Sequence, residues 1–351
     1  MSSPTPPAPR IPVSVLTGFL GAGKSTLLNF LLRHPDMAGT AVVVNEYGEV
    51  GIDHHLIEIA RDDLELIANG CLCCTARGEI VGALLSLHAR AQQRGIALRR
   101  VIIETTGLAE PGPIVQQLLG HADLAALFAV DSVVTVVDAR NVGSTLDEHD
   151  IAVRQVTAAD QLLLSKTDLV DETAASALLR KLRAMNPEAG IEVLRHGAAR
   201  PVQFFTGGRH DPASPRYQPG PLLAVADAIR FTPLADGPAR GLLRGSGVTP
   251  REQDIQTFSL ILDEALSECR LIGWLAFMRT LCGPTLLRVK GLLQIEGRPG
   301  PTVVHGVQQA FHPLAQLAAW PDADHRSRLV FITRGWGQDV IASALAYLRA
   351  P

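Results

Sequence analysis

The sequence predicts an α/β protein, in which a parallel sheet with helices on both faces is followed by a smaller C-terminal α+β domain. Strand-like and helix-like segments alternate over the first two hundred residues, which is typical of parallel sheets. The strand-like segments are continuous apolar runs, as expected when helices cover both faces. After a stretch rich in Pro, Gly and Ala, strand-like segments follow one another directly, which indicates an antiparallel sheet. With 351 residues, the chain is long enough to build two cores.

The elements of the first domain are predicted from these apolar runs and from helical periodicity. The predicted strands are Ile11–Thr17, Thr40–Asn45, Arg100–Glu104, Ser132–Asp138, Gln161–Ser165 and Ile191–Leu194. The predicted helices are Thr26–Leu32, Glu79–Arg94 and Glu172–Met185.

The domain boundaries are predicted from shifts in composition. We expect a flexible Pro-rich tail over residues 1–10, a first domain over 11–206, a linker over 207–251 and a second domain over 252–351. The elements predicted in the second domain are a strand Ile255–Leu262, a helix Asp263–Leu281, strands Leu286–Ile295, Val303–Ala310 and Leu329–Thr333, and a final helix.

Net charge and the length of the apolar runs indicate which classes of partner to exclude. A net charge of −3 gives no basic surface for nucleic acid, so no nucleic-acid partner is expected. No apolar run is long enough to span a bilayer, so no membrane partner is expected either. The first ten residues lack the apolar core of a signal peptide, and we therefore expect a cytoplasmic protein.

A glycine-rich motif after the first predicted strand identifies a nucleotide site. The stretch G-F-L-G-A-G-K-S begins at Gly18 and fits G-x-x-x-x-G-K-[ST], the loop that cradles the phosphates of ATP or GTP. Its backbone N–H groups face the phosphates, Lys24 reaches the β- and γ-phosphates, and the Ser25 hydroxyl is a Mg²⁺ ligand. The nucleotide-binding residues predicted here are Gly18, Gly21, Ala22, Gly23, Lys24, Ser25 and Thr26.

Two residues after the third strand complete the predicted hydrolysis machinery. In GTPases with this loop, an acidic residue at this point holds Mg²⁺ through water, and a glycine three residues later offers its N–H to the γ-phosphate. Here these residues are Glu104 and Gly107, which we assign with Lys24 to catalysis. The alternative role for Glu104 is a salt-bridged strand end.

A later strand ends in S-K-T-D, which is similar to the N-K-x-D motif that reads guanine. We predict that the Asp168 carboxylate accepts from guanine N1–H and N2–H₂, and that the Lys166 stem stacks on the base. Ser165 stands where most GTPases carry Asn, and its shorter side chain is expected to brace the loop less well. The sequence therefore predicts GTP, with less certain discrimination against ATP.

Three of the five cysteines, Cys71, Cys73 and Cys74, lie close together in the sequence. Thiolates are soft ligands that suit Zn²⁺, and three of them leave the fourth tetrahedral position open. An open set is better suited to handing zinc over than to bracing a fold. A closed structural zinc site and a C-x-x-C redox pair are the alternatives. We expect Cys269 and Cys282, which lie in an apolar helical pattern, to be core residues.

The motifs together resemble one known family. G-F-L-G-A-G-K-S-T, N-E-Y-G-E-V-G-I-D, N-G-C-L-C-C-T, E-T-T-G-L-A-E-P and S-K-T-D occur in the order shown by the CobW-like GTPases, which are related to the nickel-insertion GTPases of urease and hydrogenase maturation. The resemblance covers nearly the whole chain and is weaker in the second domain. It implies a metallochaperone that uses GTP, Mg²⁺ and Zn²⁺, with Co²⁺ as the other candidate cargo.

The expected function is therefore a GTPase that transfers metal to a client protein under nucleotide control. Glu46, Glu49 and His54 are the candidates for a fourth metal ligand, because they lie on a segment expected to move with nucleotide state. The motifs identify no Gln or Arg that orients the attacking water, so a partner or a second copy of the chain in a homodimer is expected to supply that group. A metal sensor without turnover and a small-molecule kinase are the alternatives.

Overall fold

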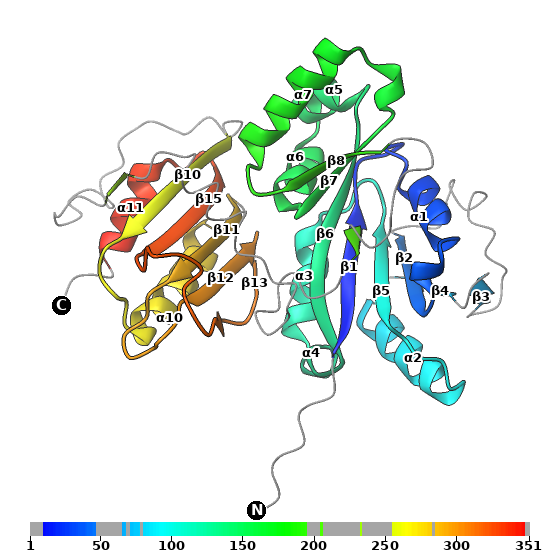
Figure 1. The fold of residues 1–351 in the computed structure, drawn as a ribbon, viewed down its shortest axis with the longest axis horizontal. Coiled ribbons are helices and arrows are strands. Elements are labelled where there is room, and N and C mark those ends of the chain that lie inside the picture. The colour runs from blue at the N-terminus through cyan, green and yellow to red at the C-terminus, as the bar shows by residue number, and fades with distance from the viewer. Residues whose placement is uncertain are drawn as a thin grey trace, which may run out of the picture.

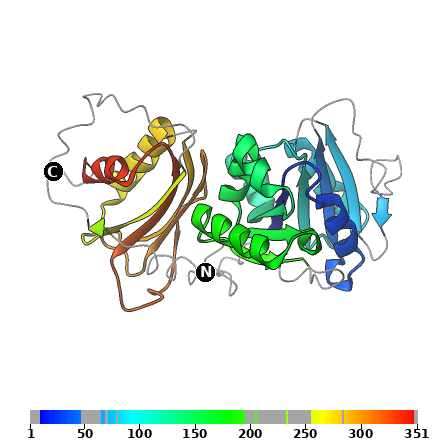
Figure 2. The same cartoon turned by 90° about the horizontal axis from the view of Figure 1, so that it is seen from above.

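The computed structural model describes residues 10–46, 65–67, 71–77, 80–194, 204–205, 232–233, 255–282 and 285–347. Within these ranges the chain forms two separate sheets, each with its own core, as the two views in Figure 1 and Figure 2 show. Glu49 and His54 lie outside the described residues, and for Glu46, Cys71, Cys73 and Cys74 the description covers the backbone alone. No helix in the described ranges has the length and apolar character needed to cross a membrane.

The first sheet confirms the predicted fold class. Its strand order is β3-β4-β2-β5-β1-β6-β7-β8, and every neighbouring pair is parallel except the antiparallel pair β3–β4. The strands are β1 (Ile11–Thr17), β2 (Thr40–Glu46), β3 (Glu65–Ile67), β4 (Cys71–Arg77), β5 (Arg100–Thr105), β6 (Phe128–Asp138), β7 (Gln161–Ser165) and β8 (Gly190–Val193).

Helices cover both faces of this sheet (Figure 1). On β1, Val13 and Val15 belong to one apolar cluster and Leu16 to another, so successive residues are buried on opposite faces. This is why the strands read as continuous apolar runs. The helices are α1 (Lys24–Leu32), α2 (Ile80–Gln93), α3 (Pro111–Gly120), α4 (Ala122–Leu127), α5 (Val142–Glu148), α6 (Asp150–Ala158) and α7 (Glu172–Met185), with 3₁₀ turns at Pro35–Met37 and Thr167–Leu169.

The second sheet has the order β13-β12-β11-β15-β10-β9 and is antiparallel apart from the short parallel pair β10–β9. Its core combines aliphatic side chains with aromatic rings, and the Trp274 ring packs edge-on against Phe331 at 6.1 Å between centroids. The elements are β9 (Thr232–Pro233), β10 (Ile255–Leu262), α10 (Glu268–Phe277), β11 (Leu286–Leu293), β12 (Thr302–Val307), β13 (Ala310–Phe311), β14 (Ala315–Gln316), β15 (Ser327–Arg334) and α11 (Gln338–Tyr347), and a π-helical turn covers Met278–Cys282.

Three sequence predictions are corrected by this fold. The helix predicted from Asp263 begins at Glu268, because the Ser267 side chain caps its N-terminus by accepting from Arg270 N. Cys269 is exposed and not a core residue, because the buried positions of this helix fall at Leu271 and Trp274. The cysteine motif, which is absent from the predicted strands, begins strand β4 between β2 and β3, and β3 itself was not predicted.

The two domains touch along one side of the first domain. Strand β10 lies against α7, β11 against α6 and β13 against α3. In Figure 2 the yellow-to-red second domain accordingly lies beside the green helices of the first. Along β11, Val289 faces the aromatic core while Arg288 and Lys290 contact acidic residues of the first domain, as the alternation of a strand requires.

Candidate nucleotide and metal site

The phosphate loop links the end of β1 to the start of α1 through three glycines with positive φ. Gly18, Gly21 and Gly23 have φ values of 139°, 71° and 97°. A methyl group on Gly18 would lie 2.3 Å from the carbonyl oxygen of Val136, so no larger residue fits there. The loop thus follows the path that turns backbone N–H groups toward an anion.

Lys24 lies folded over this loop. Its Nζ donates to the carbonyl oxygens of Gly18 at 2.8 Å and Phe19 at 3.4 Å, and the residue is 9% exposed. No side chain caps the N-terminus of α1, where Gly23 holds the N-cap position. A buried ammonium group and an uncapped helix N-terminus together form an environment that favours a phosphate anion.

The predicted magnesium ligands lie next to each other. Ser25 Oγ donates to Glu104 Oε1 at 2.6 Å, although the two residues are far apart in sequence. Glu104 is 4% exposed near the end of β5 and stands in register with Leu16 of the neighbouring β1. A hydroxyl and a carboxylate are the hard oxygen ligands that Mg²⁺ prefers, so this pair fits the ion.

Gly107, the third predicted catalytic residue, packs directly against the phosphate loop. A methyl group on Gly107 would lie 2.5 Å from the backbone nitrogen of Leu20. The carbonyl of Gly107 is held from the other side by Gln155, whose Nε2 donates to it at 3.1 Å. Sequence reasoning missed Gln155, whose only signal is an amide on the otherwise apolar face of α6.

The residues of the S-K-T-D motif also reach the phosphate loop. Ser165 Oγ donates to the carbonyl oxygen of Ala22 at 2.7 Å, so this serine does brace the loop. Lys166, at a left-handed φ of 56°, donates from Nζ to the Gly21 carbonyl oxygen at 2.8 Å and to Asp138 Oδ2 at 2.7 Å. Asp168 is exposed in the 3₁₀ turn that follows, which leaves its carboxylate accessible to a base.

Asp138, at the end of β6, is a second residue that sequence reasoning missed. Burial raises the pKa of its carboxyl group, but hydrogen bonds from Lys166, from Asn141 and from the backbone of Arg140 outweigh that effect. The pKa of Asp138 therefore lies below its ordinary value, and the carboxylate stays charged opposite Lys166. This pair holds the lysine along the phosphate loop, where a guanine ring would stack.

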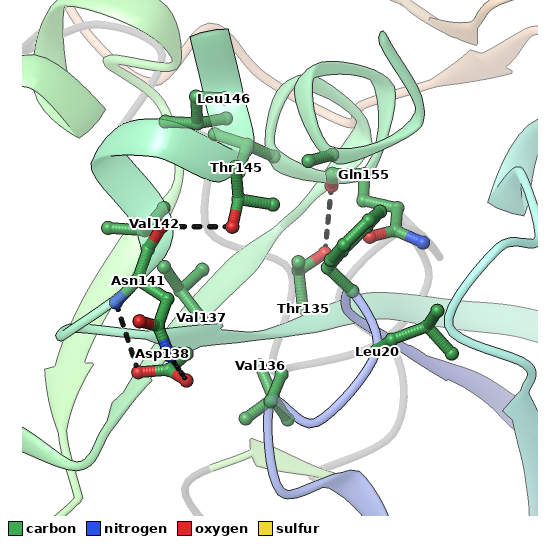
Figure 3. A pocket seen from close by; sticks show the side chains of 14 residues that line it. Leu20, Thr135, Val136, Val137, Asp138, Asn141, Val142, Thr145, Leu146 and Gln155 are labelled. Atoms are coloured by element: carbon green, nitrogen blue, oxygen red, sulfur yellow. Dashed lines mark hydrogen bonds between the residues drawn. The ribbon is translucent and has the colours of Figure 1, made fainter. Parts of the chain in front are cut away.

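A pocket of about 120 Å³ opens between the phosphate loop and helices α5 and α6 (Figure 3). Phe19 and Leu20 line it from the loop, the end of β6 lines it from the sheet, and Gln155 lines it from α6. The side chain of Phe19 stacks on His149 at 4.6 Å between ring centroids. The pocket therefore lies between the phosphate loop and α6, with Gln155 in its lining.

The cysteine strand lies in the same sheet as the magnesium ligands. In the strand order β4-β2-β5, Cys74 is in register with Val43, which is in register with Ile103, the residue before Glu104. Neighbouring strands lie about 4.8 Å apart, so the backbones of Cys74 and Glu104 are on the order of 10 Å apart. Within the ranges whose side chains are described, no cluster of three His, Cys, Asp or Glu residues suits a metal ion.

Known proteins confirm the family that the motifs resemble. Residues 12–192 match the CobW/HypB/UreG nucleotide-binding domain, and residues 255–349 match the cobalamin synthesis protein CobW C-terminal domain. The zinc chaperone YjiA of Escherichia coli (strain K12) is 32% identical over 97% of this chain and 99% of its own length. The chain belongs to the CobW family. The predicted enzyme class, a P-loop GTPase, is confirmed with it.

Solved structures agree with this assignment over both domains. The crystal structure of the Zn(II)-bound YjiA GTPase from E. coli superposes with a TM-score of 0.71 at 30% identity, covering 97% of this CobW-family chain and all of YjiA. A second Zn(II)-bound structure of YjiA, in which one glutamate and two cysteines are replaced by alanine, gives the same TM-score at 29% identity.

Proposed function

We propose that this protein is a zinc chaperone in which GTP hydrolysis controls zinc binding at Cys71, Cys73 and Cys74. The observation that carries the proposal is the register of the first sheet, where the cysteine strand β4 is two strands from β5 and Glu104. The relatives support zinc as the metal that this protein carries, since YjiA is a zinc chaperone and its crystal structure has Zn(II) bound.

The nucleotide end supplies the charge that phosphoryl transfer requires. Lys24 and the backbone N–H groups from Gly21 to Ser25 bind the phosphates and stabilise the charge that develops on them. Ser25 and Glu104 would hold Mg²⁺, and the bound ion would supply positive charge to the phosphates. Asp168 selects guanine and Lys166 stacks beneath it.

The metal end is an incomplete set of thiolates. Three cysteines occupy at most three of the four positions that Zn²⁺ prefers, and Glu46, Glu49 or His54 completes the set in one nucleotide state. Opening that fourth position releases the metal to a ligand of a client protein that requires it. Co²⁺ is the second candidate cargo for the same ligands.

Coupling between the two ends follows from shared segments. The γ-phosphate of GTP binds Gly107 and draws in the segment that follows Glu46, the last residue of β2, the strand that pairs with β4. Zinc and GTP both favour the conformation in which the two segments are drawn together, and each shifts the equilibrium by its difference in affinity between the two conformations. By thermodynamic linkage, each ligand then strengthens the binding of the other by one common factor. Intrinsic turnover is slow until a client or a second copy of the chain supplies a group that orients the attacking water.

A zinc titration with a chelating dye as competitor tests the proposal. We expect zinc to bind at least about fivefold more tightly in the presence of a non-hydrolysable GTP analogue than with GDP, given typical coupling energies of about 1–3 kcal/mol. Cys73→Ser removes this difference, whereas Cys269→Ser, which changes an exposed thiol outside the cluster, leaves it intact. Equal zinc affinity with both nucleotides contradicts the proposal.

The quantity to compare is the difference in zinc affinity between the GTP-analogue and GDP states, and not the amount of zinc that a variant carries. YjiA with two cysteines and a glutamate replaced still carries Zn(II), so residual zinc on a variant does not identify the site that nucleotides control. Phosphate release measured in parallel separates a chaperone from a sensor, because a sensor that uses GTP as a structural ligand shows no turnover with zinc and Mg²⁺ present.

A further inference from the structure

One buried amide connects the loop of Gly107 to helix α6. Gln155 is 1% exposed, and its Nε2 donates to the carbonyl oxygens of Gly107 at 3.1 Å and Ala109 at 3.0 Å. A single side chain thus holds the backbone on both sides of Leu108. Because the loop contributes the N–H that is expected to meet the γ-phosphate, its orientation matters for GTP and much less for GDP.

Gln155 is itself fixed in place. Its backbone carbonyl oxygen accepts a hydrogen bond from Thr135 Oγ1 of β6 at 2.8 Å, which Figure 3 shows as a dashed line and which anchors this turn of α6 to the sheet. On the opposite side of the loop, Gly107 is packed against the backbone of Leu20, where even one methyl group would clash. The loop of Gly107 is therefore clamped between the phosphate loop and Gln155.

The second domain holds helix α6 near both of its ends. At the first residue, Asp150 Oδ2 accepts from Arg334 Nη1 of β15 at 2.7 Å. At the last turn, Arg288 of β11 donates to the carbonyl oxygen of Ala158 and to the carboxylate of Asp160. Arg288 is 1% exposed, and Glu188 lies 3.6 Å from its Nε.

The second domain also contacts the helix that follows the loop. Helix α3 starts at Pro111, and a methyl group on Gly112 would lie 1.9 Å from Gln308 Oε1. Gln308 has a φ of 53° in the turn that joins β12 to β13, so that turn is shaped to fit against α3. Both helices next to the loop of Gly107 are thus held by the same domain.

We propose that Gln155 is a positioning residue for GTP hydrolysis and that the second domain, acting through α6, sets its position. Gln155 keeps the loop of Gly107 pressed against the phosphate loop, so that the γ-phosphate meets a preorganised N–H. Any movement of the second domain that shifts α6 changes this preorganisation. The inference rests on the GTPase activity alone and not on zinc.

The test compares GTP-analogue affinity, GDP affinity and kcat in purified full-length variants. Gln155→Met removes both hydrogen bonds at nearly constant volume, and we expect kcat and affinity for a non-hydrolysable GTP analogue to fall about tenfold. GDP affinity is expected to stay within about twofold, since GDP has no γ-phosphate for the loop to meet. The matched control is Thr157→Val, a buried residue of the same helix whose hydroxyl bonds only to Val153 and Arg154 within α6.

The second half of the proposal is tested at the domain boundary. Arg334→Met releases the first residue of α6, and we expect the ratio of GTP-analogue to GDP affinity to fall about threefold, with Arg298→Met as a control within the second domain. Wild-type ratios in Gln155→Met, or equal losses for both nucleotides, overturn the role of Gln155. A wild-type ratio in Arg334→Met together with a lowered ratio in Gln155→Met overturns the control by the second domain. Neither result bears on zinc coupling, which the titration above tests separately.

Discussion

Two of the buried charged clusters in the described part of the chain differ in the partners of their charged groups. At the phosphate loop, Lys24 donates to two backbone carbonyl oxygens and Glu104 accepts from the hydroxyl of Ser25. At the domain boundary, Arg288 and Lys290 lie opposite Asp160. The first cluster lies around the phosphate loop and the end of β5, whereas the second links the two domains. We therefore propose that the first is a binding site, and we call the second the joint.

The largest expected effect tests the binding site. Lys24→Ala removes the ammonium group that meets the transferring phosphate, and we expect kcat to fall by about 10³-fold. Lys181→Ala, which breaks an exposed ion pair with Asp147, is the matched control and should leave turnover unchanged. Phosphate release under saturating GTP measures both, and a comparable loss in the two variants would contradict the assignment.

The next largest effect tests the joint. Arg288→Met leaves Asp160 and Glu188 buried without their main partner, and we expect the free energy of unfolding to fall by about 3–5 kcal/mol. Arg298→Met breaks a more exposed pair with Glu268 and should cost less than about 1 kcal/mol. Urea denaturation followed by tryptophan fluorescence compares the two, and similar losses would show that the buried cluster is not a joint.

A third prediction concerns the base that the site selects. Asp168→Asn removes the charged acceptor for guanine. Because a hydrogen bond to a charged group contributes about 1.5–3 kcal/mol, we expect the preference for GTP over ATP to fall at least tenfold. Asp147→Asn is the exposed control. Competition between unlabelled ATP and a fluorescent GDP checks the preference, and an unchanged ratio would remove Asp168 from the guanine site.

The smallest predicted effect is the pH dependence of the joint. Burial raises the pKa of Glu188 more than Lys290 and Arg288 lower it, with Asp160 adding to the increase. A raised pKa means that the folded state holds this proton to higher pH than the unfolded state does. The stability it contributes is therefore present below the ordinary pKa of 4.5 and is lost as pH rises above it.

Glu188→Gln isolates this contribution. Because Gln does not titrate, the stability of the variant relative to the wild type should rise as pH increases from 4.5 toward neutrality. Denaturation at several pH values measures the difference. A difference that stays constant with pH would show that Glu188 titrates alike in both states.

The sequence predicted the site where the chemistry lies in short motifs. The glycines, Lys24 and Ser25 follow one another along the chain, and Glu104 follows an apolar strand, so each is recognisable from its neighbours. Asp138 and Gln155 were missed because their roles arise from partners more than 25 residues away in sequence. A strand end and a helical amide carry no local mark of such contacts.

The joint between the domains was equally hidden. Arg288 lies on β11, where the alternation of apolar and charged residues predicts a strand with one exposed face. That face is instead covered by α6, and this packing of one domain on the other cannot be recognised from residue spacing. The strand that begins at Cys71 was not predicted for a related reason, since its formation depends on pairing with β2 and β3.

The central claim is that the nucleotide site and the cysteine strand are energetically coupled, and reciprocity tests it most directly. Affinity for a non-hydrolysable GTP analogue is measured by calorimetry with and without saturating zinc, on the wild type and on Cys73→Ser. We predict that zinc tightens GTP-analogue binding by the same factor by which the analogue tightens zinc binding, and that Cys73→Ser reduces this factor to one. Analogue affinity that zinc leaves unchanged in the wild type would contradict the account.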